Sequence, residues 1–232
     1  MKMIKDYSIE RYTDASRKAI DDSVIIEYPL DLYVNEDKVN TLYISPKDIK
    51  YLTIGYLYTN GYISHISDII KINLQEDRGK IFVEIKNSKY DFKLNNKGNS
   101  LKVEEIYKIV AEFENKSDTF KKTGAAHSVA LAHNNEILNF QEDVSRSNAV
   151  DKVIGYILYN KIDVSDKYLL LSCRISELIM EKIIAINIKT VISISPPTSL
   201  AIDMAKNNGI NLIGFARNKR FNLYNKNDLE LI

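Results

Sequence analysis

The sequence predicts an α/β protein in which a smaller N-terminal α+β part, residues 1–118, precedes an α/β layered domain, residues 119–232. In the first part, apolar and polar residues alternate over short runs, which indicates paired strands. In the second part, short apolar runs alternate with helical stretches of about 10 to 15 residues, which is typical of helices packed on a partly parallel sheet. The polar stretch "ENKSDT" separates the two parts.

The N-terminal part reads as a hairpin, a helix and a second strand pair. "DLYVN" and "VNTLYIS" alternate on either side of "EDK", and "IIKINLQ" and "KIFVEIK" flank "EDRG". Ser45, Pro46 and Asp48 are expected to give the helix an N-cap, a proline at its first position and an acidic first turn. Gly61 is expected to end this helix. The polar loop "NNKGNS", residues 95–100, leads into an amphipathic helix over "LKVEEIYKIVAEF".

The C-terminal part begins with an expected hairpin, "HSVALAH" and "EILNFQ" joined over "NN". Helices are then predicted over "AVDKVIGYILYN", "SELIMEKIIAI" and "TSLAIDMAKNNG". Strands are predicted over "YLLLS", "TVISIS" and "NLIGFA", the last leading into "RFNLY". The uninterrupted apolar runs predict buried strands.

Composition narrows the classes of function. With 45% hydrophobic and 27% charged residues the chain is an ordinary globular protein, and 32 Lys and Arg against 31 Asp and Glu predict neither a nucleic-acid nor a membrane partner. The first residues contain no apolar run of signal-peptide length, and no run of 18 apolar residues occurs, so we expect a cytoplasmic protein. The single cysteine, Cys173, excludes an intramolecular disulfide and a Cys-rich zinc site.

Four polar segments follow predicted strands: residues 141–148, 172–176, 195–199 and 215–220. In an open α/β sheet, ligands bind beyond the carboxyl ends of the strands, so these segments are expected to meet at one edge. Three of them open a helix, whose N–H groups favour an anion, and three carry arginine. They predict a site for a polar, phosphorylated ligand. An alternative interpretation of the first segment is that Asp143 or Asn148 caps the helix and Arg146 pairs with Glu142.

Several motifs in this order resemble the FdhD/NarQ family, the formate dehydrogenase accessory sulfurtransferases. They are "TGAAHSVAL", "EDVSRSNAVDKVIG", "LSCRISELIMEK", "SISPPTSLAIDMA" and "LIGFARNKRFNLY", preceded by "EYPLDLYVN" and "SPKDIKYLTIGYLYTNGYI". The resemblance extends from about Glu27 to Tyr224. It implies a cytoplasmic homodimer whose C-terminal part is similar to the cytidine-deaminase-like α/β fold.

The resemblance also implies a function in maturation of the molybdenum cofactor. Family members take sulfur from a cysteine desulfurase and pass it to the molybdenum or tungsten of the bis-guanine-dinucleotide cofactor, so that formate dehydrogenase or a similar molybdoenzyme becomes active. They bind that cofactor, and we expect GDP to serve as a surrogate ligand. The stretch matching "FARNKR" is the region to which cofactor binding is ascribed. The expected cofactor-binding residues are His127, Arg146, Asn148, Asp151, Lys152, Arg174, Thr198, Phe215, Ala216, Arg217, Asn218, Lys219 and Arg220.

The residues of the basic run and His127 also have interpretations that involve no ligand. Arg217, Lys219 and Arg220 offer three cations to pyrophosphate groups, but a basic run between two strands is also typical of a solvated turn. His127 contacts the ligand or is a hydrogen-bonded residue at a strand end, and the resemblance favours the ligand contact.

The sequence departs from the family where sulfur is carried. The family's Cys-x-x-Cys pair belongs in the loop that here reads "NNKGNS", and neither asparagine nor serine forms a persulfide. The family's Gly-Arg-His-Asn appears as "SRSN", its Thr-Gly-Gly-x-His as "TGAAH" and its Ser-Gly-Arg as "SCR". Two functions stay open: a sulfurtransferase that works without the pair, or a non-catalytic paralogue that binds the cofactor or a guanine nucleotide. No catalytic residue is assigned.

Cys173 is the only thiol that could replace the pair. It lies between a predicted strand and a helix start, where the helix N-terminus and Arg174 would lower its pKa, but a lone cysteine after an apolar strand is also typical of a small buried side chain. A zinc deaminase site needs His-x-Glu and Pro-Cys-x-x-Cys, and His127 is followed by Ser128 and Val129 with no second cysteine in the chain. No metal ligand is predicted.

Overall fold

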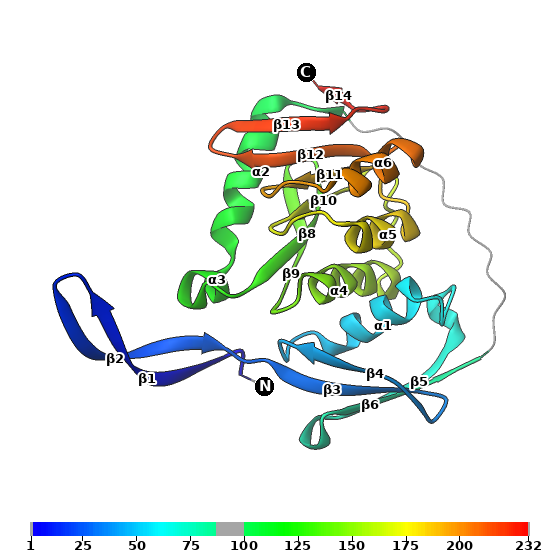
Figure 1. Cartoon of the computed structure of the whole chain (residues 1–232). Helices are drawn as coiled ribbons and strands as arrows, with labels where there is room; N and C mark the ends of the chain where they lie inside the picture. The colour runs from blue at the N-terminus through cyan, green and yellow to red at the C-terminus, as the bar shows by residue number, and fades with distance from the viewer. Residues whose placement is uncertain (1, 87–99, 232) are drawn as a thin grey trace.

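The computed structural model describes residues 2–86 and 100–231, and its strands form four sheets (Figure 1). A two-stranded arm precedes a four-stranded sheet, a six-stranded sheet carries most of the C-terminal part, and β7 (Ser100–Leu101) pairs with β14 (Glu230–Leu231). Residues 95–99 of the predicted loop "NNKGNS" lie outside the described residues. The α/β fold class is confirmed.

The arm is a hairpin of β1 (Ile4–Thr13) and β2 (Ser16–Ile25) that projects from the body of the molecule (Figure 1). On one face, Ser23 donates to Asp6 over 2.6 Å and Ser8 donates to Asp21 over 2.7 Å. The sequence does not predict this hairpin, because apolar residues do not alternate clearly along it and its pairing depends on polar contacts between the strands.

The four-stranded sheet has the order β4-β3-β6-β5 and confirms the two predicted strand pairs. Its strands are β3 (Tyr28–Val34), β4 (Asp37–Ile44), β5 (Ile69–Gln75) and β6 (Lys80–Ile85). Asn35 and Glu36 join the first pair with φ values of 46° and 76°, the left-handed geometry of a tight two-residue hairpin turn. The parallel pairing of β3 with β6 unites the two pairs into one sheet.

Helix α1 (Ile49–Thr59) begins later than its expected start, and the predicted cap is wrong. Ser45 instead contacts the C-terminal part: its N–H donates to Asp143 over 3.1 Å, and its hydroxyl accepts from the N–H of Val144 over 2.9 Å. Asp48 is the N-cap residue, but its side chain makes no capping bond. Gly61 follows the helix with a φ of 76°, as predicted.

The six-stranded sheet has the order β13-β12-β11-β10-β8-β9 and helices on both faces (Figure 1). Leu169 and Leu171 of β10 pack toward one face, and Tyr168 and Leu170 toward the other, so the strand is buried on both sides as its apolar run predicts. The strands are β8 (His127–His133), β9 (Glu136–Asp143), β10 (Tyr168–Leu171), β11 (Thr190–Ser193), β12 (Asn211–Arg217) and β13 (Arg220–Asn225). The helices are α2 (Val103–Lys116), α3 (Asp118–Thr123), α4 (Arg146–Tyr159), α5 (Glu177–Ala185) and α6 (Ser199–Asn207).

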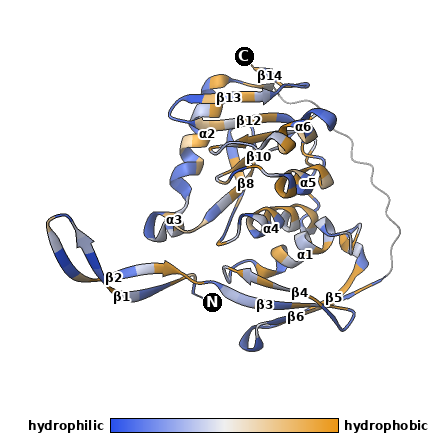
Figure 2. Ribbon diagram, in the orientation of Figure 1, coloured by the Kyte–Doolittle hydropathy of each residue, from blue (hydrophilic) through white to orange (hydrophobic). Residues whose placement is uncertain are grey.

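One hydrophobic core runs through both predicted parts. It includes Leu32 of β3 and Leu57 of α1 together with Val153 of α4 and Leu171 of β10. Figure 2 shows hydrophobic residues throughout the strands and helices that pack together, and mixed hydropathy along the arm. Helix α2, which precedes the predicted boundary at residue 118, packs on the six-stranded sheet. The sheet edge that carries the polar segments is therefore held on a rigid, two-sided core.

Candidate functional site at the edge of the six-stranded sheet

The carboxyl ends of four strands lie at the same edge of the six-stranded sheet. β10, β11 and β12 are parallel to one another, and β9 is parallel to β10 because both are antiparallel to β8. The four polar segments therefore share one edge, as expected, and β8 begins at it. The edge is long, since β9 and β12 are four strand spacings, about 19 Å, apart.

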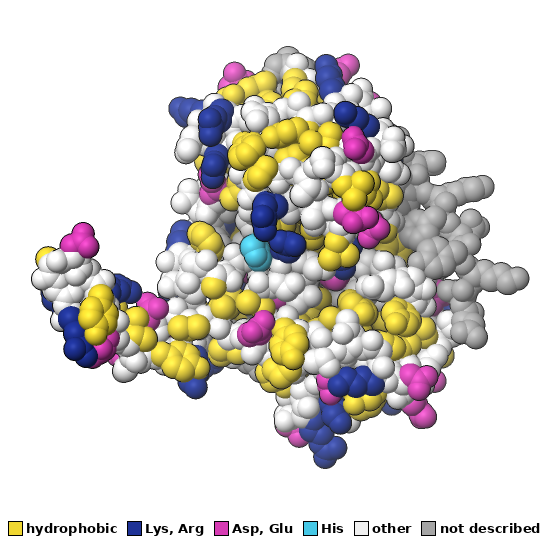
Figure 3. Space-filling view, in the orientation of Figure 1, with side chains coloured by type: hydrophobic (Ala, Val, Ile, Leu, Met, Phe, Trp, Pro, Cys, Tyr) yellow, Lys and Arg dark blue, Asp and Glu magenta, His cyan; other side chains and the backbone are white. Residues whose placement is uncertain are grey.

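Three of the predicted binding residues form a central cluster at this edge: His127, Arg146 and Arg174. His127 begins β8 and is half-buried, and its pKa is lowered by burial and by both neighbouring guanidinium groups, with Asp143 opposing them. Neither arginine forms a hydrogen bond or an ion pair with another described residue. The central cluster thus combines an imidazole whose pKa is lowered with two guanidinium groups that have no ion-pair partner in the described part of the chain. Figure 3 shows Lys and Arg side chains beside a histidine near the middle of the face in view.

Hydrogen bonds from backbone groups and serine and threonine hydroxyls hold the loops at this edge in place. The N–H of Ser128 donates to the hydroxyl of Ser172 over 2.8 Å, and the N–H of Ser172 donates to the carbonyl of Ser128 over 3.0 Å. The hydroxyl of Ser195 in turn donates to the carbonyl of Ser172 over 2.8 Å. Thr198, another predicted binding residue, caps α6 at this edge by accepting from Ala201 over 3.4 Å. The loops after β10 and β11 are therefore tied to the start of β8.

The alternative interpretation of the first segment is wrong. Glu142 does not pair with Arg146, because its carboxylate accepts hydrogen bonds from the hydroxyls of Ser117 and Thr119. The N-cap residue of α4 is Ser145, without a side-chain capping bond. Arg146 therefore has no ion-pair partner among the residues that the structure describes and is available to a ligand at the sheet edge.

Asn148, Asp151 and Lys152, three of the residues expected to bind the cofactor, instead hold the interior together. Lys152 and Asp143 are both fully buried, 2.7 Å apart, and the Lys152 ammonium also donates to the carbonyls of Ser45 and Glu142 over 3.0 and 2.9 Å. These three contacts use all its donors.

Asp151 and Asn148 are likewise hydrogen-bonded to other protein groups. Asp151 accepts from Lys182 over 2.6 Å and from Thr59 over 3.0 Å. The amide of Asn148 donates to the carbonyl of Tyr43 over 2.8 Å. The polar atoms of these residues bind protein groups between the two sheets and are not available to a ligand.

The stretch "FARNKR" forms the turn between β12 and β13, which we call the basic hairpin, residues 215–220. Asn218 and Lys219 have φ values of 54° and 53°, the left-handed geometry of a two-residue type I′ turn, and Phe215 has a φ of 52° at an irregularity in the ladder. Ala216 is buried, whereas the four residues after it are exposed. Their side chains line a pocket of about 300 Å³ against α2.

A second pocket, of about 370 Å³, adjoins the first along the same helix and reaches His127. We call it the α2 pocket. Its apolar lining includes Phe113, Phe120 and Ile194, and Glu114 lines both pockets. Sequence reasoning missed Phe120 and Glu114, because the stretch "ENKSDT" reads as a polar boundary and nothing in it shows that α2 borders a ligand-sized hollow.

Cys173 is a buried side chain with 3% exposure. Burial raises the pKa of its thiol to about 11, although Arg146 and Arg174 pull the pKa down. The interpretation of Cys173 as a small buried side chain is confirmed, and loss of hydration outweighs the lowering of its pKa that the two cations cause.

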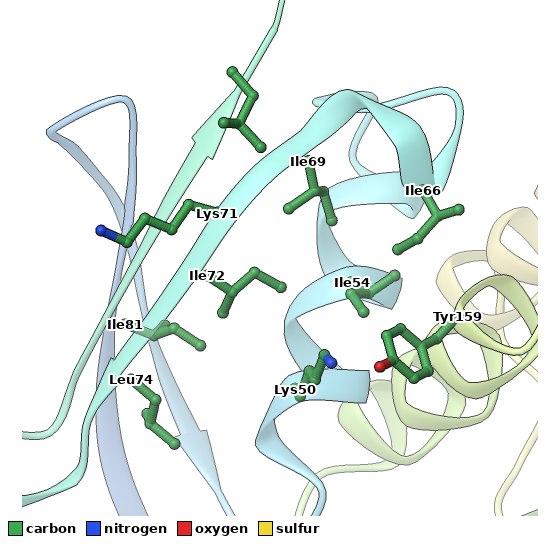
Figure 4. Close-up of a pocket in the computed structure, with 10 residues that line it drawn as sticks. Lys50, Ile54, Ile66, Ile69, Lys71, Ile72, Leu74, Ile81 and Tyr159 are labelled. Atoms are coloured by element: carbon green, nitrogen blue, oxygen red, sulfur yellow. The ribbon is translucent and has the colours of Figure 1, made fainter.

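Other parts of the described structure offer less to a charged ligand. A hollow of about 500 Å³ lies between β5 and α1, lined by aliphatic side chains such as Ile54 and Ile72 (Figure 4). There the Lys50 ammonium lies 3.8 Å from the centre of the Tyr159 ring. Within residues 2–86 and 100–231, no group of His, Cys, Asp and Glu side chains could hold a metal ion, and no helix is long and apolar enough to cross a membrane.

Comparisons with known proteins agree with the resemblance seen in the motifs. Residues 25–99 and 92–229 match the model of the FdhD/NarQ family. The "Sulfur carrier protein FdhD" of Listeria innocua is 31% identical over 97% of each chain, and the protein of the same name from Bacillus subtilis is 30% identical over 92% of each. "Protein FdhD" of Methanocaldococcus jannaschii is 33% identical over 96% of each chain.

A solved structure has the same fold. It is described as "a putative formate dehydrogenase accessory protein from Desulfotalea psychrophila", is 26% identical and aligns over 97% of each chain with a TM-score of 0.86. The cytidine-deaminase-like similarity stays an expectation. Matching motifs, matching fold and similarity over nearly the full length lead to one conclusion: the chain belongs to the FdhD/NarQ family.

Proposed function

We propose that this chain is a formate dehydrogenase accessory protein that binds the molybdenum or tungsten bis-guanine-dinucleotide cofactor and carries no sulfur on a cysteine. One observation carries the binding part: Arg146 and Arg174 flank His127 at the sheet edge without an ion-pair partner among the described residues. Unpaired guanidinium groups beside a helix N-terminus are the groups that bind phosphate most strongly. Family membership supports the choice of cofactor.

The site suits a large ligand with several phosphates. Arg146 is the first residue of α4, so its guanidinium acts together with the positive end of a helix of 14 residues. Arg217, Lys219 and Arg220 of the basic hairpin provide further cations along the same edge. Two groups of cations fit a cofactor whose pyrophosphates are separated by its metal-binding core. The expected homodimer would present a second copy of the same edge.

The absence of sulfur transfer follows from the thiol chemistry. No cysteine occupies residues 95–100, and the only thiol in the chain, Cys173, is buried and protonated at neutral pH. A persulfide forms when a thiolate attacks, so Cys173 is a poor acceptor of sulfur from a cysteine desulfurase. The client in this proposal is a formate dehydrogenase or a similar molybdoenzyme, which receives the bound cofactor.

A second candidate function is sulfur transfer itself, with Cys173 as a relocated carrier. It is favoured by the two arginines whose charges act on the Cys173 thiol, Arg146 and Arg174, and by relatives named sulfur carrier proteins. The two functions differ in one measurement. After incubation with a cysteine desulfurase, cysteine and a persulfide probe, a carrier gains the mass of one sulfur atom on Cys173, and a pure binder stays unlabelled. Cys173→Ser is the control that removes any such label.

Binding itself is tested by calorimetry with GDP, which represents half of the cofactor. We expect saturable binding that weakens as salt concentration rises, because the contacts are between phosphate and arginine. Absence of heat with millimolar GDP would reject the proposed function. A persulfide on Cys173 would reject only its second part and favour the carrier.

A further inference from the structure

We infer that Asp143 and Ser45 are positioning residues of the ligand site, which hold the start of α4, and with it Arg146, in place at the sheet edge. This inference rests on the proposed function. It adds that the N-terminal part of the chain helps to build a site whose proposed phosphate-binding residues all lie in the C-terminal part. We call the hydrogen-bonded side chains of Ser45, Asp143, Asn148 and Lys152 the Asp143 network.

Each oxygen of the Asp143 carboxylate has two donors. One oxygen accepts from the N–H of Ser145 over 2.9 Å and from the amide of Asn148 over 3.1 Å, and both donors belong to the start of α4. The other oxygen accepts from the N–H of Ser45 over 3.1 Å and from the Lys152 ammonium over 2.7 Å. The carboxylate is fully buried, which strengthens these contacts. Asp143 therefore joins the end of β4 to the first turn of α4.

The segment before Arg146 is fixed by hydrogen bonds. The N–H of Val144 donates to the hydroxyl of Ser45 over 2.9 Å, across 99 residues of sequence, and the N–H of Ser145 donates to Asp143. The backbone donors of both residues before Arg146 are thus bonded. Because Arg146 has no ion-pair partner in the described part of the chain, this supporting backbone sets where its side chain begins.

The network also lies next to the histidine of the central cluster. Asp143 ends β9 and is the register partner of His127 at the start of β8. Burial lowers the pKa of His127 most, Arg146 lowers it further, Asp143 raises it and Arg174 lowers it. The pKa of His127 therefore reports where the Arg146 guanidinium lies.

A second buried ion pair on α4 provides a comparison. Asp151 pairs with Lys182 over 2.6 Å and accepts from the hydroxyl of Thr59 over 3.0 Å, so it too is bonded to the N-terminal part. It lies five residues, about 7.5 Å, further along α4 than Arg146. Buried ion pairs add little stability over apolar side chains of similar size, and the position of Asp143 directly before the helix gives it a role that Asp151 lacks.

The experiment compares Ser45→Ala with Thr59→Val in the full chain. Ser45→Ala removes the acceptor of the Val144 N–H and leaves every charge in place. Thr59→Val is the matched control, because it also breaks a hydrogen bond between the N-terminal part and α4, at Asp151. In Ser45→Ala, GDP affinity measured by calorimetry should fall by about two- to tenfold. In Thr59→Val it should equal that of the wild type.

The pKa of His127, followed by NMR titration without nucleotide, is the second readout. The chain has three histidines, and His127→Asn assigns the signal. In Ser45→Ala the pKa of His127 should rise, because Arg146 can move away from the imidazole while Asp143 keeps its charge. In Thr59→Val it should not change. A loss of stability alone moves neither readout.

Asn148→Ala removes other contacts of the Asp143 network, those to Asp143 and to the carbonyl of Tyr43, and should act in the same direction as Ser45→Ala. Thermal unfolding of each variant shows whether the fold is kept. Wild-type GDP affinity and an unshifted His127 pKa in Ser45→Ala and Asn148→Ala would overturn the inference and leave the proposed function standing. Failure of the wild type to bind GDP would reject the proposed function, and the His127 titration would still decide whether the network holds Arg146.

Discussion

A Cβ atom on Gly155 of α4 would lie 1.8 Å from the carbonyl oxygen of Tyr51 in α1. The contact is reciprocal, since a Cβ on Gly55 of α1 would lie 1.9 Å from the carbonyl oxygen of Asp151 in α4. The two helices therefore touch backbone to backbone, and only glycine permits this approach. The crossing joins the four-stranded sheet to the six-stranded sheet and sets the position of the α4 N-terminus, where Arg146 begins the helix.

Gly155→Ala should strongly destabilise the protein. The new methyl group overlaps a backbone oxygen that no side-chain rotation can move away, so the helices must separate, at a cost of about 1–3 kcal/mol or more. Urea unfolding followed by circular dichroism measures the change. Ser147→Ala in the first turn of the same helix is the control and should change the free energy of unfolding by less than about 0.5 kcal/mol. Equal stability of the two variants would mean that the close crossing is not required.

Lys152→Met should lower the free energy of unfolding by about 3–5 kcal/mol, because it leaves the Asp143 carboxylate buried without its counter-ion. The double variant Asp143→Asn with Lys152→Met should be less destabilised than Lys152→Met alone, since it removes the uncompensated charge. Urea unfolding of the three proteins measures both effects. A loss below about 1 kcal/mol in Lys152→Met would show that the pair contributes as little as an exposed one.

Arg146→Ala and Arg174→Ala should each weaken GDP binding by about 1.5–3 kcal/mol, the range for a hydrogen bond to a charged group. Arg78→Ala is a suitable control because Arg78 is exposed and lies at the turn between β5 and β6. Calorimetry at two salt concentrations should show a smaller salt dependence in the first two variants and an unchanged one in the control. Unchanged affinity in both test variants would remove the central cluster from the binding site.

Arg217→Ala and Arg220→Ala should each weaken GDP binding by about 1–3 kcal/mol if the basic hairpin contacts phosphate. Lys226→Ala removes a cation just beyond β13, away from the turn, and serves as the control. The same calorimetric titration decides the question. Affinities equal to wild type in both hairpin variants would identify "FARNKR" as a surface turn.

Cys173 should react slowly with iodoacetamide in the folded protein. With a pKa of about 11, its thiolate fraction at pH 8 is about one in a thousand and rises about tenfold per pH unit. The labelling rate, followed by mass spectrometry, should rise with pH in the same way and increase sharply after unfolding in urea. Rapid labelling at pH 8 in the folded state would contradict both the burial and the raised pKa.

The raised pKa of Cys173 also predicts a direction for stability. The folded protein holds the thiol proton more tightly than the unfolded chain, whose thiol has an ordinary pKa near 9. This contribution to stability is therefore complete below about pH 9 and is lost as the pH rises toward 11.

Local patterns in the sequence were sufficient for much of the fold. The apolar runs "YLLLS" and "TVISIS" predict strands buried on both faces, because a strand with alternate side chains on two apolar layers needs no polar position. Parallel strands direct the segments after them to one edge, so the shared location of the polar segments was predictable as well. The absence of the cysteine pair from residues 95–100 is evident from the sequence alone.

Which charges are free was decided by tertiary structure alone. Arg146 and Lys152 lie in the same short stretch. Lys152 is neutralised by Asp143 and donates to the carbonyl of Ser45, 107 residues away in sequence, whereas Arg146 has no such partner within residues 2–86 and 100–231. The hydrogen bond from Thr59 of α1 to Asp151 of α4 depends on the same helix crossing, and Lys182 of α5 supplies the counter-ion of Asp151. A charged side chain becomes structural or available according to the partners that distant segments bring to it, because burial makes an unpaired charge too costly to keep. The sequence by itself therefore determines which side chains carry a charge, and the tertiary structure determines which of those charges has a partner.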